Sequence, residues 1–429
     1  MVRSDVAGAG HRPALSDLPS SASTAQRFES AWQSLLPIGR DADTGGYRRY
    51  AWTEADSACR AWFLEQARAR QLIVEPDGCG NLLAWWDVAG GNRDGAVLTG
   101  SHLDSVPDGG AFDGPLGVIS SLCAVDLLRE RGVTPRRGLA VGVFADEEGA
   151  RFGLACVGSR LLSGVLTLPT AYALRDAAGI TMRDAMLAAG VDLDASTRGE
   201  VTRFAAFVEL HIEQGRGLAD MQSSIGIATA IWPHGRWRFT FRGEANHAGT
   251  TRLVDRHDPM LPFAATAIAA RRLAANAGAV ATFGRLSVEP NATNGVPSAV
   301  HAWLDARAAD ELTLEQVVTN LSGEATSEAT GHGVRLEVVQ ESSTPEVRFD
   351  AALRERMAVS LRTAGFDPPE LSTGAGHDAG ILSESIPTGM LFVRNQTGVS
   401  HSPAEHADLA DCLDGVRALA TVLEDLLCR

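Results

Sequence analysis

The feature that most constrains the fold is a glycine-rich stretch, Gly100 to Gly117, with the sequence GSHLDSVPDGGAFDGPLG. An apolar run, Ala96 to Leu98, precedes it and predicts a buried strand. Apolar residues recur at helical spacing after it: Val118, Leu122, Val125 and Leu128. The stretch is therefore predicted to be a loop between a strand and a helix. In open α/β sheets, ligands bind at loops of this kind.

The loop carries His102, Asp104 and Asp113 among glycines that let the backbone turn tightly. An imidazole and a carboxylate that converge on one point form a mixed ligand set suited to zinc, manganese, nickel or cobalt. The alternative is a polar turn in which Asp113 caps the following helix.

Further polar residues follow other predicted strands. Glu147 and Glu148 come after the apolar run 139–145, His211 ends the run 205–210, and His401 follows the run 388–393. Because consecutive residues point in different directions, one carboxylate of the glutamate doublet can bind a metal while the other acts as a general base. The alternative for the doublet is an acidic helix start, and a lone histidine is more often structural.

The candidate ligands number too many for one tetrahedral zinc. They are His102, Asp113, Glu148, His211 and His401. With one carboxylate shared, they suit a site for two metal ions roughly 3.5–4 Å apart.

Composition limits the class of protein. The net charge of −15, from 38 basic and 53 acidic residues, argues against a nucleic-acid surface and an anionic membrane. The six cysteines show no CxxC pairing, which favours free thiols in a reducing cytoplasm. No apolar run approaches the roughly 18 residues of a membrane span. Residues 1–24 lack an apolar segment and are expected to form a disordered tail.

The order of predicted elements indicates two domains. Strands alternate with helices over residues 25–225, which predicts a mostly parallel, covered sheet. Residues 226–340 follow the order β-α-β-β-α-β, which is typical of a ferredoxin-like unit whose open sheet face offers a dimerisation surface. Residues 341–429 return to the first pattern and are expected to complete the first domain around this insertion.

Several motifs together resemble the binuclear metallo-amidohydrolases related to zinc aminoacylases and carboxypeptidases, in the hydantoinase/carbamoylase branch. That branch holds N-carbamoyl-L-amino-acid hydrolases, β-ureidopropionases and allantoate amidohydrolases. The resemblance runs from about Phe28 to the final helix. Its motifs are TGGYRR, GSHLDSVPDGGAFDGPLGV, DEEGARFG, ELHIEQG, EANHAGTT, GAGHDA and GVSHSP.

The resemblance implies a role for each candidate metal-site residue. Asp113 would bridge two divalent ions, with His102 and His211 completing one site and Glu148 and His401 the other. Glu147 would be the general base, and Asp104 would orient the His102 ring.

The resemblance also implies substrate-binding residues. His247 of the inserted domain would stabilise the oxyanion, often across the dimer, while Asn294 and Arg307 would bind the substrate carboxylate. Arg307 also ends an alternating strand, where a guanidinium suits a carboxylate or is simply a solvated charge. Gln214 and His377 would line the pocket.

The resemblance implies a homodimeric, metal-dependent hydrolase that cleaves the ureido C–N bond of allantoate or an N-carbamoyl-L-amino acid. Two alternatives stay open: a peptidase or N-acyl-amino-acid deacylase with the same metals, and a metal-free binding protein. The chain departs from the common pattern at Ile231 to Trp237 and at Arg252 to Met260. These departures bear on substrate identity rather than on reaction type.

Overall fold

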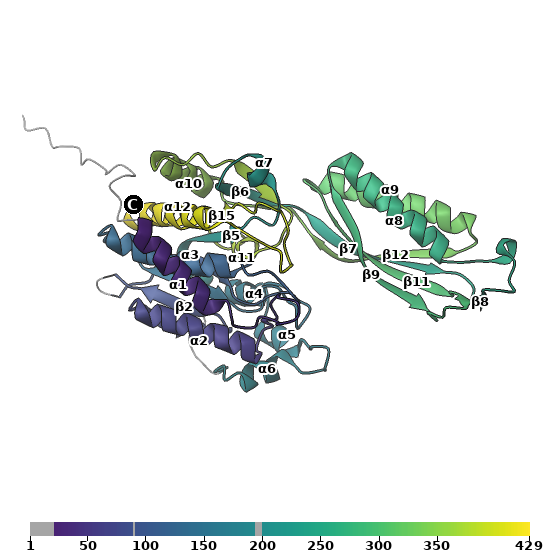
Figure 1. The fold of residues 1–429 in the computed structure, drawn as a ribbon, viewed down its shortest axis with the longest axis horizontal. Coiled ribbons are helices and arrows are strands. Elements are labelled where there is room, and N and C mark those ends of the chain that lie inside the picture. Colours follow the sequence, from purple (N-terminus) through teal and green to yellow (C-terminus); the bar gives the residue numbers. More distant parts are fainter. Residues whose placement is uncertain (1–20, 89–90, 194–199) are drawn as a thin grey trace, which may run out of the picture. The chain divides into compact units, whose positions relative to one another are not determined.

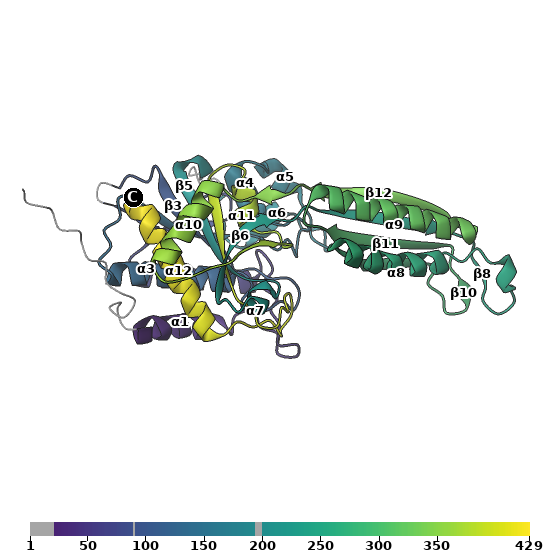
Figure 2. The ribbon, with the colours of Figure 1, turned by 90° about the horizontal axis from the view of Figure 1, so that it is seen from above.

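The computed structural model describes residues 21–88, 91–193 and 200–429 (Figures 1 and 2). Most of the tail predicted at residues 1–24 lies outside this range, and helix α1 (Ser21–Leu35) begins at its edge. The described chain divides into two compact units. The first unit comprises the described residues up to Thr229, with Phe349–Leu371 and His377–Arg429; the second comprises Ala230–Arg348 and Ser372–Gly376.

Within the described residues, the larger sheet has nine strands. In spatial order they are β1 (Ile73–Pro76), β2 (Leu82–Trp86), β4 (Leu139–Phe144), β3 (Ala96–His102), β5 (Phe204–Ile212), β15 (Thr388–Val393), β6 (Ile225–Ile231) and β13 (Val347–Arg348), with β14 (Glu370–Thr373) also paired to β6. The four central strands, β4, β3, β5 and β15, run parallel. Their carboxyl ends therefore meet at one edge of the sheet, which is where open α/β sheets place their ligands.

Helices cover this sheet and form the main core with it. Strands β3, β4 and β15 are buried along their whole length. Helix α3 (Pro115–Glu130) packs against α12 (Leu409–Cys428) and against the central strands, while α1, α2 (Glu54–Ala69) and α10 (Ala351–Thr363) complete the cover. Helix α3 begins with Pro115, which suits a first helical position because proline lacks the N–H that has no partner there.

Shorter helices lie between the strands of the first unit. They are α4 (Val157–Ser163), α5 (Leu168–Ala173), α6 (Met182–Ala188), η2 (Val201–Arg203), α7 (Gly217–Asp220) and α11 (Asp378–Leu382). A second apolar cluster, which includes Trp52, Phe152 and Met182, is buried around α4 to α6.

The second unit is built on a four-stranded antiparallel sheet of order β12-β7-β11-β9. Its elements are β7 (His234–Arg242), α8 (Met260–Ala277), β9 (Val280–Glu289), β11 (Ala299–Arg307), α9 (Glu311–Gly331) and β12 (Arg335–Thr344). Helices α8 and α9 lie side by side on one face of the sheet (Figures 1 and 2). Phe239, Phe241 and Leu304 are buried in the core of this unit, because alternate residues of β7 and β11 face inward.

A short arm extends the second unit. It consists of β8 (Asn246–His247), which pairs with β10 (Gly295–Val296), and the 3₁₀ turn η3 (Leu253–Asp255). The ion pair of Arg252 with Asp255 (2.6 Å) closes this turn, and Leu253 and Val254 at its tip are 81% and 86% exposed.

The predicted fold class is confirmed: a mostly parallel sheet is accompanied by a separate βαββαβ unit. By its internal contacts the second unit runs from residue 230 to residue 348, against the predicted 226–340, and its strand β12 continues to Thr344. Residues 372–376, predicted with the first domain, belong to the second unit. No helix in the described ranges is both long and apolar enough to cross a bilayer.

Candidate metal centre

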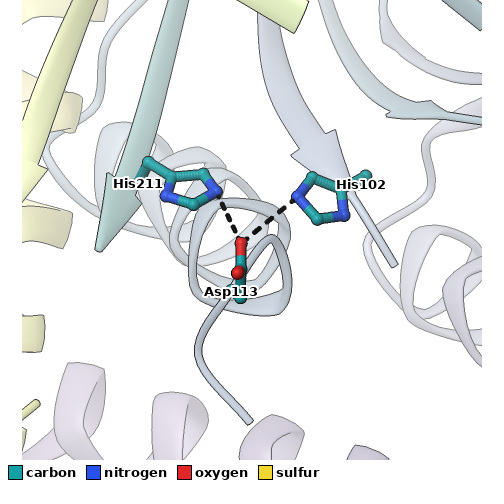
Figure 3. Close-up of side chains that lie close together, drawn as sticks. All are labelled: His102, Asp113 and His211. Carbon is teal, nitrogen blue, oxygen red and sulfur yellow. Dashed lines mark ion pairs between the residues drawn. The ribbon is translucent and has the colours of Figure 1, made fainter. Parts of the chain in front are cut away.

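Three predicted ligands converge at the carboxyl edge of the larger sheet. His102 is the last residue of β3, His211 lies near the end of β5, and Asp113 lies in the loop before α3. Asp113 Oδ1 is 3.6 Å from His102 Nε2 and 3.3 Å from His211 Nε2. Figure 3 shows the two imidazole rings pointing at this one carboxylate from neighbouring strands.

The other oxygen of Asp113 faces a second ligand set. Asp113 Oδ2 is 3.3 Å from His401 Nε2, which is in turn 3.7 Å from Glu148 Oε2. Glu148 follows β4, and His401 lies in the loop after β15. The two sets therefore share the carboxylate of Asp113, one set on each oxygen.

The loop between His102 and α3 depends on glycine at one position. Gly114 has a φ of +80°, and a Cβ there would lie 2.6 Å from the ring of His102. Glycine at this position lets Asp113 approach the histidine while the chain turns into α3.

These residues fit divalent metal ions. Metal–nitrogen and metal–oxygen bonds of zinc are ~2.0–2.2 Å, so two ligand atoms of a tetrahedral site stand roughly 3.3–3.6 Å apart. The separations around Asp113 are 3.3–3.6 Å. Among the described residues, His211 Nε2 and Glu148 Oε1 are buried without a hydrogen-bond partner. Unpaired buried polar atoms are costly, and a bound cation would satisfy them.

The pKa values of the site residues also indicate that a cation binds here. Burial alone would raise the pKa of Asp113, but its contacts with His102 and His211 outweigh burial and hold that pKa well below its usual range. Burial would lower the pKa of His102, yet Glu147 and the neighbouring aspartates raise it well above normal. Burial and nearby carboxylates raise the pKa of Glu148 well above its usual range. The buried carboxylates exceed what the histidines can balance, as expected where cations complete the site.

Asp104 contacts the ring of His102 with both its main chain and its carboxylate. The ring Nδ1 of His102 is 3.2 Å from the main-chain oxygen of Asp104 and 3.5 Å from its carboxylate. The Asp104 carboxylate accepts hydrogen bonds from the main-chain N–H groups of Glu147 (3.2 Å) and Glu148 (3.0 Å). Asp104 therefore joins the loop after β3 to the loop after β4.

Glu147 lies beside the first ligand set rather than within it. Its Oε2 is 3.8 Å from His102 Nε2, and its Oε1 accepts a hydrogen bond from the thiol of Cys156 (3.3 Å). Burial, followed by nearby carboxylates, raises the pKa of Glu147 well above normal despite the opposing charge of His102.

Gln214 and His377 both lie at the ligand cluster. Gln214 Nε2 donates to Asp113 Oδ2 (2.9 Å). The buried ring of His377 lies 4.5 Å from that of His211, and burial holds its pKa well below the usual value, so it is neutral near pH 7.

Three predicted substrate-binding residues belong to the second unit. His247 and Asn294 lie side by side in the arm, because Ala248 N–H donates to the carbonyl of Asn294 (2.9 Å). Arg307 ends β11 and pairs with Asp305 through Nε (2.8 Å) and Nη2 (3.2 Å). Its Nη1 donates to the carbonyl of Gly374.

Sequence reasoning missed two buried acids near the ligands. Glu209 accepts hydrogen bonds from Ser101 Oγ (2.8 Å) and Ala379 N (3.0 Å). Glu405, in the loop before α12, accepts hydrogen bonds from the main chain at Phe112 and Asp113. Glu209 lies within the ELHIEQG motif, two residues before His211, a signal that sequence reasoning passed over. The one signal for Glu405 is its position four residues after His401.

The model of peptidase family M20/M25/M40 matches residues 98–425. The chain is 37% identical to N-carbamoyl-L-amino acid amidohydrolase of Geobacillus stearothermophilus, over 91% of this chain and 96% of that protein. It is 30% identical to allantoate amidohydrolase of Escherichia coli strain K12, over 93% and 98%.

A solved structure of similar fold is a hydantoinase/carbamoylase-family amidase from Burkholderia vietnamiensis, with a TM-score of 0.84, 29% identity, and coverage of 94% of this chain and 98% of that one. The matched region contains each candidate ligand and Glu147. The chain therefore belongs to peptidase family M20/M25/M40, in the amidohydrolase branch of the hydantoinase/carbamoylase type.

Proposed function

We propose that the protein is a two-metal amidohydrolase that cleaves the ureido C–N bond of allantoate or an N-carbamoyl-L-amino acid. The observation that carries this proposal is the pair of ligand sets sharing Asp113, with the carboxylate of Glu147 beside them. One water adds to the ureido carbonyl and ammonia leaves; the carbamic acid that remains then loses carbon dioxide to give the amine, so one water is consumed per ureido group. Relatives named for both substrates cover nearly the whole chain.

Two divalent ions, of zinc, manganese, nickel or cobalt, would be held by this chain's own residues. His102, Asp113 and His211 would hold one, and Asp113, Glu148 and His401 the other. When bound, such ions supply Lewis acidity and make water a stronger nucleophile near neutral pH.

Glu147 is the general base in this proposal. Its carboxylate takes a proton from the attacking water and returns it to the leaving nitrogen, a role that requires a carboxylate beside the ligands but not committed to them. Cys156 donates a hydrogen bond to Oε1 of Glu147, and the other oxygen, Oε2, faces His102.

Arg307, with Asn294, binds the substrate carboxylate. A guanidinium has five N–H donors, and Asp305 and Gly374 accept from three of these groups. The end-on edge of the guanidinium, with one N–H on each terminal nitrogen, suits a bidentate carboxylate. Asp305 thus fixes the plane of Arg307 without occupying that edge.

His247 stabilises the oxyanion in a partner subunit of a homodimer. Strand β9 is an edge of the sheet in the second unit, and edge strands offer unpaired main-chain groups to another chain. On α8, Leu261 and Ile268 are 52% and 73% exposed. A symmetric partner would cover both features.

The compartment proposed for the enzyme is the cytoplasm. Within the described ranges, which contain all six cysteines, no disulfide joins any of them, as is usual in a reducing compartment.

An ammonia-release assay tests the proposed reaction. Purified protein, loaded separately with zinc, manganese, nickel or cobalt, is offered allantoate, β-ureidopropionate and several N-carbamoyl-L-amino acids. Dipeptides and N-acetyl amino acids are offered in parallel and their products measured. We expect metal-dependent ammonia release from a ureido substrate. Turnover of only the peptides or acetyl amino acids would replace this function by peptidase or deacylase activity.

A further inference from the structure

We propose that Glu405 is a positioning residue that holds the loop bearing Asp113 against the loop bearing His401. One loop carries Asp113, whose carboxylate is shared by the two ligand sets, and the other carries His401 of the second set. The distance between the loops therefore determines whether Asp113 can bind a metal ion in both sets. This inference rests on the metal-dependent function proposed above.

One oxygen of Glu405 binds the Asp113 loop through its backbone. Glu405 Oε2 accepts hydrogen bonds from the main-chain N–H groups of Asp113 (3.0 Å) and Phe112 (3.2 Å). The side chain of Glu405 is almost fully buried. Because the contact is to the backbone, the Asp113 carboxylate remains directed at the histidines.

The other oxygen of Glu405 binds the His401 loop. Glu405 Oε1 accepts a hydrogen bond from the hydroxyl of Ser400 (2.9 Å), the residue before His401. Gln214 Nε2 donates both to Ser400 Oγ (3.1 Å) and to Asp113 Oδ2 (2.9 Å). These contacts close a ring of hydrogen bonds that runs from Asp113 through Glu405, Ser400 and Gln214 back to Asp113.

Two backbone features support a role for this ring. His401 adopts a left-handed conformation with φ of +52°, which is unfavourable for a residue with a side chain and must be held by its surroundings. Residue 110 is glycine, and a Cβ there would overlap the carboxylate of Glu405. The chain thus leaves space for Glu405 at this position.

Three substitutions separate position from charge. Glu405→Ala removes the acceptor for both loops. Glu405→Asp keeps the charge but is one methylene too short to reach both. Glu405→Gln keeps the length, and its amide oxygen can accept from both main-chain N–H groups.

The test measures zinc affinity of each metal-free protein by competition with a chromophoric chelator, alongside thermal unfolding without metal. We expect Glu405→Ala and Glu405→Asp to weaken zinc binding by about 10- to 100-fold, the usual effect of removing a group that orients metal ligands. Glu405→Gln should retain most of the wild-type affinity. Gly110→Ala, which keeps Glu405 but fills its space, should also weaken binding, and it serves if Glu405→Ala does not fold.

The control is Asp126→Asn. Asp126 is a largely buried acid on α3 that pairs with Arg70 (2.9 Å) and has no contact with the ligand loops in the described structure. This variant should lower the unfolding temperature and leave zinc affinity unchanged.

Two results would overturn the inference. In one, Glu405→Ala behaves like the control, which makes the residue merely structural. In the other, Glu405→Gln loses as much affinity as Glu405→Ala, which assigns the effect to charge. A wild-type protein that binds no divalent ion would instead overturn the proposed function, because affinity is measured without any substrate.

Discussion

At the scale of single residues, two adjacent glutamates have distinct surroundings. Glu148 faces His401 and has an unpaired buried oxygen, whereas Glu147 is held by the thiol of Cys156 and lies outside the ligand sets. The difference follows from the loop after β4, where consecutive side chains diverge while Asp104 binds both main-chain N–H groups.

Replacing Glu147 tests this division of roles. Glu147→Gln keeps the size of the side chain but cannot accept the proton of water, so we expect turnover to fall by at least about a hundredfold. Metal content, measured by elemental analysis, should remain that of the wild type. Loss of bound ions would show that Glu147 is a metal ligand, and the roles of Glu147 and Glu148 would then be exchanged.

Arg307 offers a second test at this scale. Arg307→Ala should raise KM for carboxylate-bearing substrates, because charge-assisted bidentate hydrogen bonds contribute on the order of 2 kcal/mol. Arg238→Ala is the matched control, since Arg238 lies in the same sheet and pairs with Glu341 (3.0 Å). Steady-state kinetics with equal KM values for wild type and Arg307→Ala would rule out the substrate role.

The difference between the predicted ligands and Glu405, which sequence reasoning missed, has a physical reason. His102, Asp113 and His211 follow strands whose apolar runs are visible in the sequence, so their convergence follows from parallel strand order. Glu405 acts on Asp113 from nearly three hundred residues away. Its role depends on how two irregular loops meet, which no local periodicity records.

At the scale of elements, apolar runs located the central strands well. The run 388–393 coincides with β15, and 205–210 lies within β5. Strand β6 was missed because its sequence, IGIATAI, is short, largely buried and without alternation, and it lies beside a change of domain. Its partner β15 pairs with it antiparallel, an arrangement fixed only in three dimensions.

A turn between β1 and β2 gives a pH test of this packing. Asp77 is buried and accepts hydrogen bonds from Cys79 N and from Asn81, whose own side chain binds Ala145 N at the end of β4. Burial outweighs these hydrogen bonds and raises the pKa of Asp77 to about 6. At pH values between the ordinary pKa of an aspartate and about 6, Asp77 is therefore protonated in the folded protein but ionised in the unfolded chain.

The sign of the effect follows. Stability from this raised pKa is fully present below the unfolded value of about 4 and is lost as pH rises through about 6. Asp77→Asn cannot ionise, so its stability relative to wild type should improve by roughly 1 kcal/mol between pH 5 and 7.5. Urea unfolding of both proteins at several pH values measures this difference, and a difference that does not change with pH would contradict it.

At the scale of the whole molecule, all five candidate metal ligands belong to the first unit and His247 to the second. A catalytic role for His247 thus requires the second unit of the same chain or of a partner. The exposed apolar residues of α8 and the edge strand β9 would be covered in a symmetric dimer, which favours the second unit of a partner over that of the same chain.

Subunit mixing tests this arrangement. His247→Ala and Glu147→Gln are each expected to be inactive alone. In a mixed dimer with catalysis across subunits, one site has both residues intact, so activity should partly return when the two proteins are combined under conditions that exchange subunits. Light scattering and tagged co-purification confirm exchange, and each variant mixed with itself is the control. Exchange without recovery would place His247 on its own chain or outside catalysis.

The unequal exposure of the ligands has a kinetic consequence. His102, His211 and Asp113 are at most 5% exposed, whereas the side chain of His401 is 51% exposed. A ligand that water can reach is displaced more readily than one enclosed by protein, so the two ions of the proposed site should differ in residence time. A chromophoric chelator added to the fully loaded protein should therefore remove metal in two phases of similar amplitude. His401→Ala should abolish the fast phase and leave the slow one, whereas a single phase in the wild type would mean that the two sites exchange as one.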